Sequence, residues 1–495
     1  MHQVATASLE SPAASRVRYG VLGFACGLSM ITYLDRVCVA SAAPAMVHDL
    51  GLQSVADLKW VFTAFALAYS LCEVPSGWLG DVFGPRRVLI RIVLWWSVFT
   101  ALTGVVGLSA GGVVLGGLGT LVLVRFLFGM GEAGAYPNIT RALHNWFPPQ
   151  QRGFAQGAVW MCGRLMGGLT PLVWMLLVEG IRRPATDSGG RDAAVSLLPP
   201  LMHWRAVFWT FGLIGTAWCV LFAVWFRNRP EEKSTVNAAE LAWIRSGQAH
   251  ATAVHADTPW RQVLLSRNLW TLGLMYACQS YGWYFYITYL PEYLACRYDV
   301  PATSTLGAIY KGGPLWLGAA GCLVGGLLTD WFLRRTGNLR WSRRLFGVVG
   351  LAGSGVCFLL CPAAPTAFWL FVTISLAGFC TDFTMGAGWS TCQDIGRRHA
   401  GVVAGFMNMV GNFGGAVASW MFGFILQQSL DAYAARLRLA TTALSAAEKT
   451  AGLLHGYQIN FLIAAVIYGV GALCWLRIDP AQPVAAENGQ MPESQ

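Results

Sequence analysis

Four charged side chains stand in apolar stretches that are long enough to cross a lipid bilayer. Asp35 and Arg36 are adjacent in SMITYLDRVCVASAAPAM, and Arg125 and Glu132 lie in LVRFLFGMGEAGAYP. A charge at membrane depth costs about 2.5–3.5 kcal/mol even on the mildest insertion scale, so chains keep such residues mainly where they line an aqueous cavity or pair with one another. Two cations and two carboxylates together predict a site that binds an anion and carries a proton.

Helical spacing predicts which of these side chains share a face. Arg125 and Glu132 are seven residues apart, so they lie on one face of a helix, two turns apart, and Tyr136 extends that face. The adjacent pair in the first stretch points about 100° apart, with Tyr33 on the side of the arginine. Arginine suits carboxylate recognition because its planar fork can bind both oxygens and keeps its charge. A pair of static salt bridges between the two helices is the alternative reading.

Composition places most of the chain in lipid. It is 55% hydrophobic and 12% charged, about half the charged fraction of a soluble domain. The net charge of +10 does not indicate nucleic-acid binding, because the arginines cluster in alternate loops instead of along one face. The 13 cysteines form no CxxC or Cys/His cluster, so no metal site and no disulfide framework are predicted.

Hydropathy predicts an all-α membrane protein, since a helix needs about 20 apolar residues to cross the hydrocarbon core. Twelve spans in two groups of six are expected, near 19–46, 59–80, 88–109, 113–141, 152–178, 205–226, 269–296, 305–331, 343–362, 366–391, 400–428 and 456–476. The expected domains are a cytoplasmic tail (1–17), an N-terminal six-helix bundle (18–226), a cytoplasmic linker (227–267), a C-terminal six-helix bundle (268–477) and a second cytoplasmic tail (478–495).

The loops predict the orientation. Arginine-rich loops follow the second, fourth, sixth, eighth and tenth spans, and the opposite loops are poorer in basic residues. By the positive-inside rule the rich side is cytoplasmic, so both termini are expected in the cytoplasm of a protein of the plasma (inner) membrane.

A repeated motif relates the two halves. The second span ends in GWLGDVFGPRR and the eighth in GGLLTDWFLRR, about half the chain apart and at the same place in each group of six. Glycine permits close helix contact, and the acid and arginines can hold helix ends together in one conformation and release them in another. The predicted latch residues are Gly77, Asp81, Arg86, Arg87, Asp330 and Arg334.

These motifs resemble a known family. GWLGDVFGPRR is similar to the signature loop of the major facilitator superfamily, although Val82 stands where that family more often has Arg or Lys. Within the superfamily, YLDRVCVASAAPAM, RFLFGMGEAGAYPNITRALHNWFP, YITYLPEYL and GVVAGFMNMVGNFGG resemble the anion:cation symporters, which include phthalate-type permeases and hexuronate, galactonate and glucarate transporters. The resemblance runs from about residue 18 to 476.

The resemblance implies a fold and an activity. The fold would be two pseudo-symmetric six-helix bundles, working as a monomer. The activity would be import of an organic anion, a sugar acid or other carboxylate, by proton symport through alternating access, with no cofactor besides the coupling protons. Asp35 and Glu132 would carry protons, and Arg36 and Arg125 would bind the anion or pair.

Several alternatives stay open. An anion exchanger and a Na⁺-coupled carrier fit the same residues. A polytopic membrane enzyme is a weaker alternative, because the eight histidines lie in or beside loops and no HExxH, nucleophile elbow or P-loop is present. A sugar acid, an aromatic carboxylate and a small dicarboxylate fit the predicted site alike.

Further polar residues are expected to complete the cavity. Arg164, in the fifth span, would bind a second carboxylate of the substrate or pair with an acid, with Glu132 as a candidate partner. Lys311 and Asp382 are weaker candidates, and the alternative for either is that it simply reaches the membrane interface. Glu73 is expected to gate or pair near the cytoplasmic end. The candidates from the second half are Gln279, Tyr284, Trp389, Ser390, Asn408 and Asn412.

Overall fold

The computed structural model describes residues 13–110, 113–183, 195–246, 258–301 and 305–485. The predicted tails and linker therefore fall partly outside the described residues.

The first half of the chain contributes seven α-helices and two short hairpins. Its elements are α1 (Val17–Asp49), η1 (Val55–Leu58), α2 (Lys59–Phe83), α3 (Pro85–Thr103), β1 (Leu108–Ala110), β2 (Val113–Leu115), α4 (Leu118–Glu132), α5 (Ala135–Trp146), η2 (Pro149–Gln151), α6 (Arg152–Trp174), the π-helical turn η3 (Met175–Glu179), β3 (Ile181–Arg183), β4 (Val195–Leu198) and α7 (Trp204–Trp225). Strands β1 and β2 pair antiparallel, as do β3 and β4.

The described elements of the linker and of the second half are all helical. The linker holds η4 (Pro230–Glu232), α8 (Ala238–Arg245) and α9 (Trp260–Leu265). The second half holds α10 (Arg267–Tyr284), the π-helical turn η5 (Phe285–Tyr289), α11 (Leu290–Tyr298), α12 (Thr305–Thr336), α13 (Leu339–Leu360), η6 (Cys361–Ala363), α14 (Ala367–Phe383), α15 (Met385–Gly396), η7 (Arg397–His399), α16 (Ala400–Leu437), η8 (Thr441–Ala443) and α17 (Ala446–Arg477).

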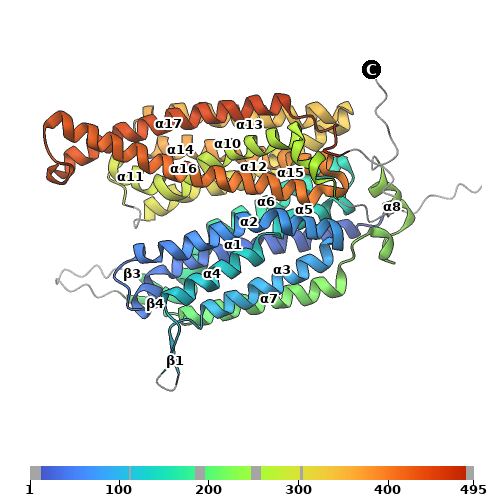
Figure 1. The fold of residues 1–495 in the computed structure, drawn as a ribbon, viewed down its shortest axis with the longest axis horizontal. Coiled ribbons are helices and arrows are strands. Elements are labelled where there is room, and N and C mark those ends of the chain that lie inside the picture. Colours follow the sequence, from blue (N-terminus) through green and yellow to red (C-terminus); the bar gives the residue numbers. More distant parts are fainter. Residues whose placement is uncertain (1–12, 111–112, 184–194, 247–257, 302–304, 486–495) are drawn as a thin grey trace, which may run out of the picture.

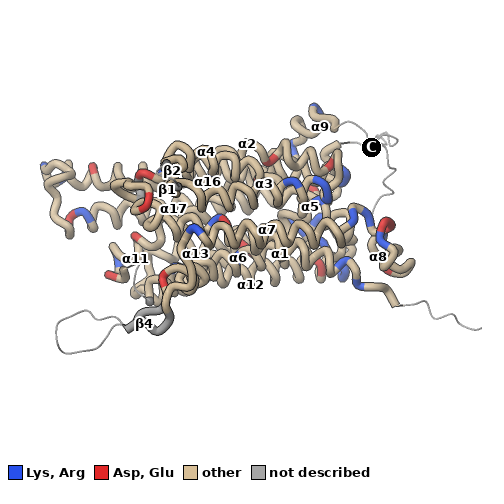
Figure 2. The backbone as a smooth tube through the Cα atoms, turned by 90° about the horizontal axis from the view of Figure 1, so that it is seen from below, with Lys and Arg blue, Asp and Glu red and all other residues tan. Residues whose placement is uncertain are grey.

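The predicted all-α membrane fold is confirmed. The two halves lie side by side as bundles of long helices (Figure 1). Charged residues gather toward the two ends of the bundles and are sparse along their middle (Figure 2). We call the end that carries α8 the linker end, and the end that carries β1–β4 the hairpin end.

The fourth and the tenth predicted spans are each broken into two helices at equivalent places of the halves, and the π-helical turn η5 divides the seventh into α10 and α11. The fourth breaks between α4 and α5, where Pro137 has no N–H to bond the carbonyl of Ala133. The tenth breaks between α14 and α15 at Thr384, whose hydroxyl bonds the Thr381 carbonyl at 2.8 Å and so competes with the helical backbone. Glu132 and Asp382 stand next to these breaks.

Candidate functional site

Arg36 and Glu132 form the ion pair that joins α1 to α4. Arg36 Nε lies 2.8 Å from Glu132 Oε1, and the carboxyl group is fully buried. The Arg36 guanidinium also lies over the ring of Tyr69 on α2, 4.3 Å from its centroid. Glu132 thus pairs with an arginine of another helix and not with Arg125 of its own.

Asp35 and Arg125 are buried, and neither has an ion-pair partner among the residues that the structure describes. The Thr100 hydroxyl lies beside the Asp35 carboxyl group, although neither Asp35 oxygen forms a hydrogen bond of strict geometry with a described residue, and Glu132 and Arg125 are its charged neighbours. The Arg125 guanidinium lies over Phe128, 4.1 Å from the ring centroid, and over Phe65 at 5.1 Å. Among the described residues no carboxylate lies within 4.0 Å of it. A buried cation and a buried carboxyl group without ion-pair partners are what an anion and a proton would satisfy.

An aromatic cluster joins the halves beside these charges. Tyr136 stacks on Trp160 with 4.3 Å between centroids, and its hydroxyl is hydrogen-bonded to Ser29 at 2.9 Å. Trp389 of α15 lies 5.0 Å from Trp160. The prediction missed Trp160, whose aromatic type alone did not separate it from packing residues. Ser390 donates at 2.6 Å to the Gly386 carbonyl of its own helix.

Arg164 of α6 is held by the other half. Its Nε and Nη2 donate to the two Asp382 oxygens at 2.8 and 3.0 Å, and Nη1 donates to the Tyr33 hydroxyl. The guanidinium lies over the Trp283 ring at 3.6 Å. The alternative that Arg164 pairs with an acid is therefore confirmed, but the acid is Asp382 and not Glu132, which faces Arg36. The alternative that Asp382 simply reaches the membrane interface is wrong, since its side chain is 2% exposed and faces Arg164. Lys311 is exposed on α12.

A carboxyl–amide cluster joins α2 to α16. Glu73 is fully buried, and its Oε1 accepts from the amide groups of Asn408 and of Asn412, the latter at 3.3 Å. Asn408 also donates to the Tyr69 hydroxyl at 3.4 Å. Glu73 thus accepts hydrogen bonds from two asparagines and forms no ion pair among the described residues, and its expected role as a gate stays a prediction.

Two further predicted residues lie on α10. Gln279 donates to the Thr381 carbonyl at 3.2 Å and accepts from the Thr384 hydroxyl at 3.0 Å, which ties α10 to the break between α14 and α15. Tyr284 is half-buried against Gly415 of α16. Their roles in binding stay predictions.

At the linker end, each half caps a helix of the other. Asp81 accepts from the backbone N–H groups of Gly401 and Val402 in the first turn of α16, at 3.0 and 2.8 Å. Asp330 accepts in the same way from Gly153 and Phe154 in the first turn of α6, at 3.0 and 2.7 Å. A carboxylate at a helix N-terminus satisfies donors that have no partner within the helix and complements the helix dipole.

Two glycine pairs allow this close approach. A Cβ atom at Gly77 would overlap the Gly401 carbonyl oxygen, and one at Gly326 would overlap the Gly153 carbonyl oxygen. The repeated motif predicted from the sequence therefore meets the opposite half through the same backbone contact twice.

The motif arginines behave differently from one another. Arg334 donates to the Gln150 carbonyl of the first half at 3.1 Å. Arg86 stays within its own half, where its backbone N–H donates to Asn228 at 2.9 Å. Arg87 is exposed, and the described residues include no ion-pair partner for it. Arg141, which the latch prediction did not include, lies 3.3 Å from Asp81.

A buried Arg–Asp–Arg group at the linker end was not predicted. Asp394 of α15 accepts from Arg152 of α6 at 2.8 Å and from Arg343 of α13 at 3.0 Å. The arginines were visible as loop charges, but their partner Asp394 lies just beyond the predicted end of the tenth span, and no local pattern connects the three residues. Together with the caps, this group closes the linker end. At the hairpin end, no hydrogen bond between described residues joins the halves.

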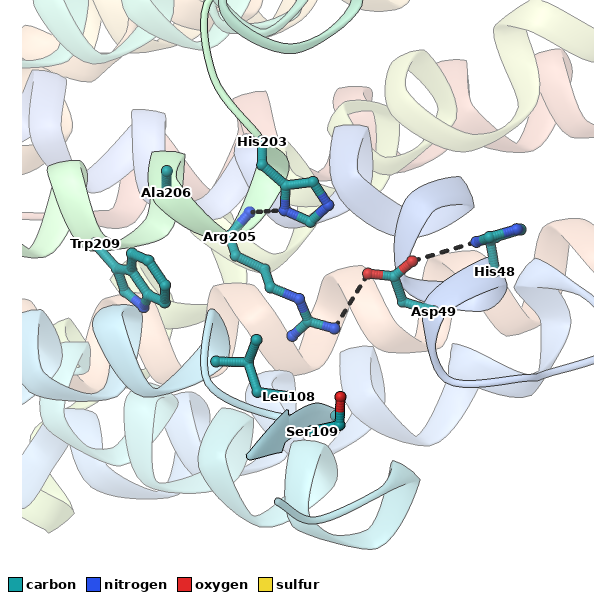
Figure 3. A pocket seen from close by; sticks show the side chains of 9 residues that line it. His48, Asp49, Leu108, Ser109, His203, Arg205, Ala206 and Trp209 are labelled. Carbon is teal, nitrogen blue, oxygen red and sulfur yellow. Dashed lines mark hydrogen bonds and ion pairs between the residues drawn. The ribbon is translucent and has the colours of Figure 1, made fainter. Parts of the chain in front are cut away.

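A separate pocket of about 580 Å³ opens at the hairpin end of the first half (Figure 3). His48, Asp49, Ser109, His203 and Arg205 are among its lining residues. Arg205 is bound by Asp49 at 3.1 Å and by the Gly104 carbonyl at 3.3 Å, so it holds the surrounding loops together. None of the predicted site residues lines this pocket.

The fold and the buried charges define a class of protein. Two helical bundles, joined at one end and at mid-height around charged groups in lipid-spanning helices, form a multi-pass membrane transporter. The chain belongs to the Major Facilitator Superfamily, whose family profile matches residues 25–419.

Curated relatives are transporters of the anion:cation symporter type. The chain is 33% identical over 469 residues to the probable sulfoacetate transporter SauU of Cupriavidus necator, covering 94% of each chain. It is 28% identical over 418 residues to the probable galactarate/D-glucarate transporter GudP of Bacillus subtilis, covering 81% of this chain and 83% of the relative. The proton:xylose symporter XylE shares the fold, with a TM-score of 0.64, 13% identity and coverage of 93% of this chain and 96% of XylE.

Proposed function

We propose that this protein imports a small organic anion, a sugar acid or other carboxylate, together with protons, by alternating access. The observation that carries the proposal is a pair of buried charged groups: among the described residues neither the Arg125 guanidinium nor the Asp35 carboxyl group has an ion pair. The transporters named for sulfoacetate and for galactarate and D-glucarate support the substrate class.

The geometry suggests how binding and proton uptake are linked. An entering anion would take up donors of Arg125 and of Arg36, whose Nη2 is buried without a hydrogen bond. Glu132 would then lose its cation. In a low-dielectric site an isolated carboxylate has a higher free energy than the protonated carboxyl group, so Glu132 would take up a proton. Glu132 and Asp35 are therefore the proposed proton carriers, and protons are the proposed coupling ion.

The closed linker end supports alternating access. Its arginine-rich loops make it the proposed cytoplasmic side by the positive-inside rule, with both chain termini inside, in the inner membrane of the cell. The described conformation is then the outward-facing one. Inward opening would require Asp81 and Asp330 to leave the helix ends that they cap. We also propose that the protein acts as a monomer.

Proton flux in proteoliposomes tests the proposal. A panel of organic acids, including sulfoacetate, galactarate and galactonate, is first screened by thermal shift. An acid that binds should drive alkalinisation of the outer medium during uptake. Glu132→Gln and Asp35→Asn should each reduce proton flux per substrate, and Arg125→Ala should abolish binding. Glu231→Gln, which removes an exposed linker carboxyl group, is the matched control.

The outcomes separate the alternatives. Exchange of internal for external acid without a pH change would favour an anion exchanger, and Na⁺-dependent uptake would favour a Na⁺-coupled carrier. Wild-type proton flux in both carboxyl variants would contradict the assignment of the proton carriers.

A further inference from the structure

Two ion pairs join the same pair of spans across the interface between the halves. Arg152 pairs with Asp394 at 2.8 Å and Arg164 pairs with Asp382 at 2.8 Å. The arginines are twelve residues apart on α6, and so are the aspartates along α14 and α15. At the helical rise this separation is about 18 Å, so the two pairs form the rungs of an antiparallel ladder.

The rungs differ in depth. The outer rung lies at the linker end, beside the Asp330 cap. The inner rung lies about 18 Å further along α6, within the apolar span. Breaking the inner rung without a substitute leaves two isolated charges at membrane depth, which is costly.

The Arg164 side of the inner rung also has the geometry of an anion-binding site. The Arg164 guanidinium binds both oxygens of one carboxylate through Nε and Nη2, in the fork geometry that it would offer a ligand. Tyr33 lies three residues before Arg36 on the same helix. It is uncharged, and its hydroxyl accepts a hydrogen bond from Arg164. Tyr33 therefore links the Arg164 site to the Arg36 region.

Other groups face Asp382 from four neighbouring helices. They are Tyr33 of α1, Tyr276 of α10, Cys322 of α12 and Tyr468 of α17. None of these carries a positive charge, so among the described groups that interact with Asp382 only Arg164 balances it.

We propose that Asp382 fills an anion site of Arg164 in the empty protein, and that the second acidic group of a two-acid substrate displaces it. This inference rests on the proposed function and narrows its substrate class to small molecules with two acidic groups. The first acidic group binds at Arg36 and Arg125, and the second replaces the Asp382 carboxylate in the guanidinium fork. The displaced Asp382 carboxylate, which then has no cation beside it, takes up a proton. Asp382 is a specificity-determining residue that acts as an internal competitor.

The competition predicts a gain of selectivity when the internal charge is removed. Asp382→Asn keeps the size and one acceptor oxygen of the side chain but loses its charge. The affinity for galactarate should rise relative to that for galactonate, which has the same carbon skeleton and one acidic group fewer. The ratio of the two dissociation constants should change by about tenfold, the low end for a hydrogen bond to a charged group. Sulfoacetate and acetate form a second probe pair.

Asp394→Asn is the matched control, because it makes the same substitution on the outer rung. It should leave the ratio of diacid to monoacid affinity unchanged, even if it alters both affinities by easing the linker end open. The double variant Arg164→Gln/Asp382→Asn removes both charges, so it leaves no unpaired ion, and it should lose the preference for the diacid.

The results distinguish the two levels of the proposal. Binding of these acids with an unchanged ratio in Asp382→Asn, or an equal change in Asp394→Asn, overturns this inference alone. If Asp382→Asn does not fold, retention of the diacid preference in the double variant overturns it. If the unmodified protein binds none of the acids, the proposed function fails and this inference fails with it.

Discussion

Gly77→Ala should open the linker end although no charged residue is substituted. The added Cβ would overlap the carbonyl oxygen of Gly401, a backbone atom that cannot rotate away. Ordinary contact between such atoms needs about 3.5 Å, so α2 and the start of α16 must separate. The separation removes the hydrogen bonds from Gly401 and Val402 to Asp81, which span 3.0 and 2.8 Å.

The size of the effect follows from those two bonds. A hydrogen bond to a charged group contributes about 1.5–3 kcal/mol. Loss of both disfavours the closed linker end by about 3 kcal/mol or more, which corresponds to a shift of about 150-fold in a two-state equilibrium. Alanine favours the helix over glycine by about 1 kcal/mol, so the helix itself should not be weakened.

Hydrogen exchange measures the change directly. The amides of Gly401 and Val402 lie in the first turn of α16, where no intrahelical acceptor exists, so their protection depends on Asp81. In Gly77→Ala these amides should exchange about 150-fold faster. Gly23→Ala on α1 is the control, because a Cβ there meets no atom within 4 Å. Unchanged protection in Gly77→Ala would refute the argument that this backbone contact holds the linker end closed.

Three further changes test the stability contributions of buried and capping groups. Arg152→Ala removes one of the two arginines that bind Asp394 and should lower the free energy of unfolding by about 1.5–3 kcal/mol, whereas Arg245→Ala, at an exposed pair, should cost about 1 kcal/mol or less; similar thermal shifts for both would contradict this. Glu73→Ala should cost about 1–3 kcal/mol in denaturant unfolding because it removes the carboxyl acceptor that two amide groups of α16 share, while Glu73→Gln should retain most of that stability; equal losses would point to the charge instead. Ser445→Ala removes the capping box of α17 and should cost about 1 kcal/mol, seen as faster amide exchange in its first turn; unchanged exchange would show that packing alone holds this end.

Much of the fold could be predicted because its signals are local. A span is a run of apolar residues, so the twelve spans were visible without knowledge of their neighbours. The helix breaks were harder to predict. Pro137 gives a local reason for the helix break after Glu132. The break at Thr384, in contrast, depends on a hydrogen bond from its hydroxyl to the Thr381 carbonyl, which forms within the folded second half.

The sequence by itself determined where the charges lie and which motif repeats. Arg36, Glu132 and Arg164 had to be in membrane-spanning helices, and the motif around Asp81 recurs around Asp330, because spacing along one helix fixes these facts. Only the tertiary structure decided the partners: Glu132 with Arg36, and Arg164 with Asp382. The physical reason is that an ion pair between spans depends on how distant helices are placed side by side. No period within either helix encodes that placement.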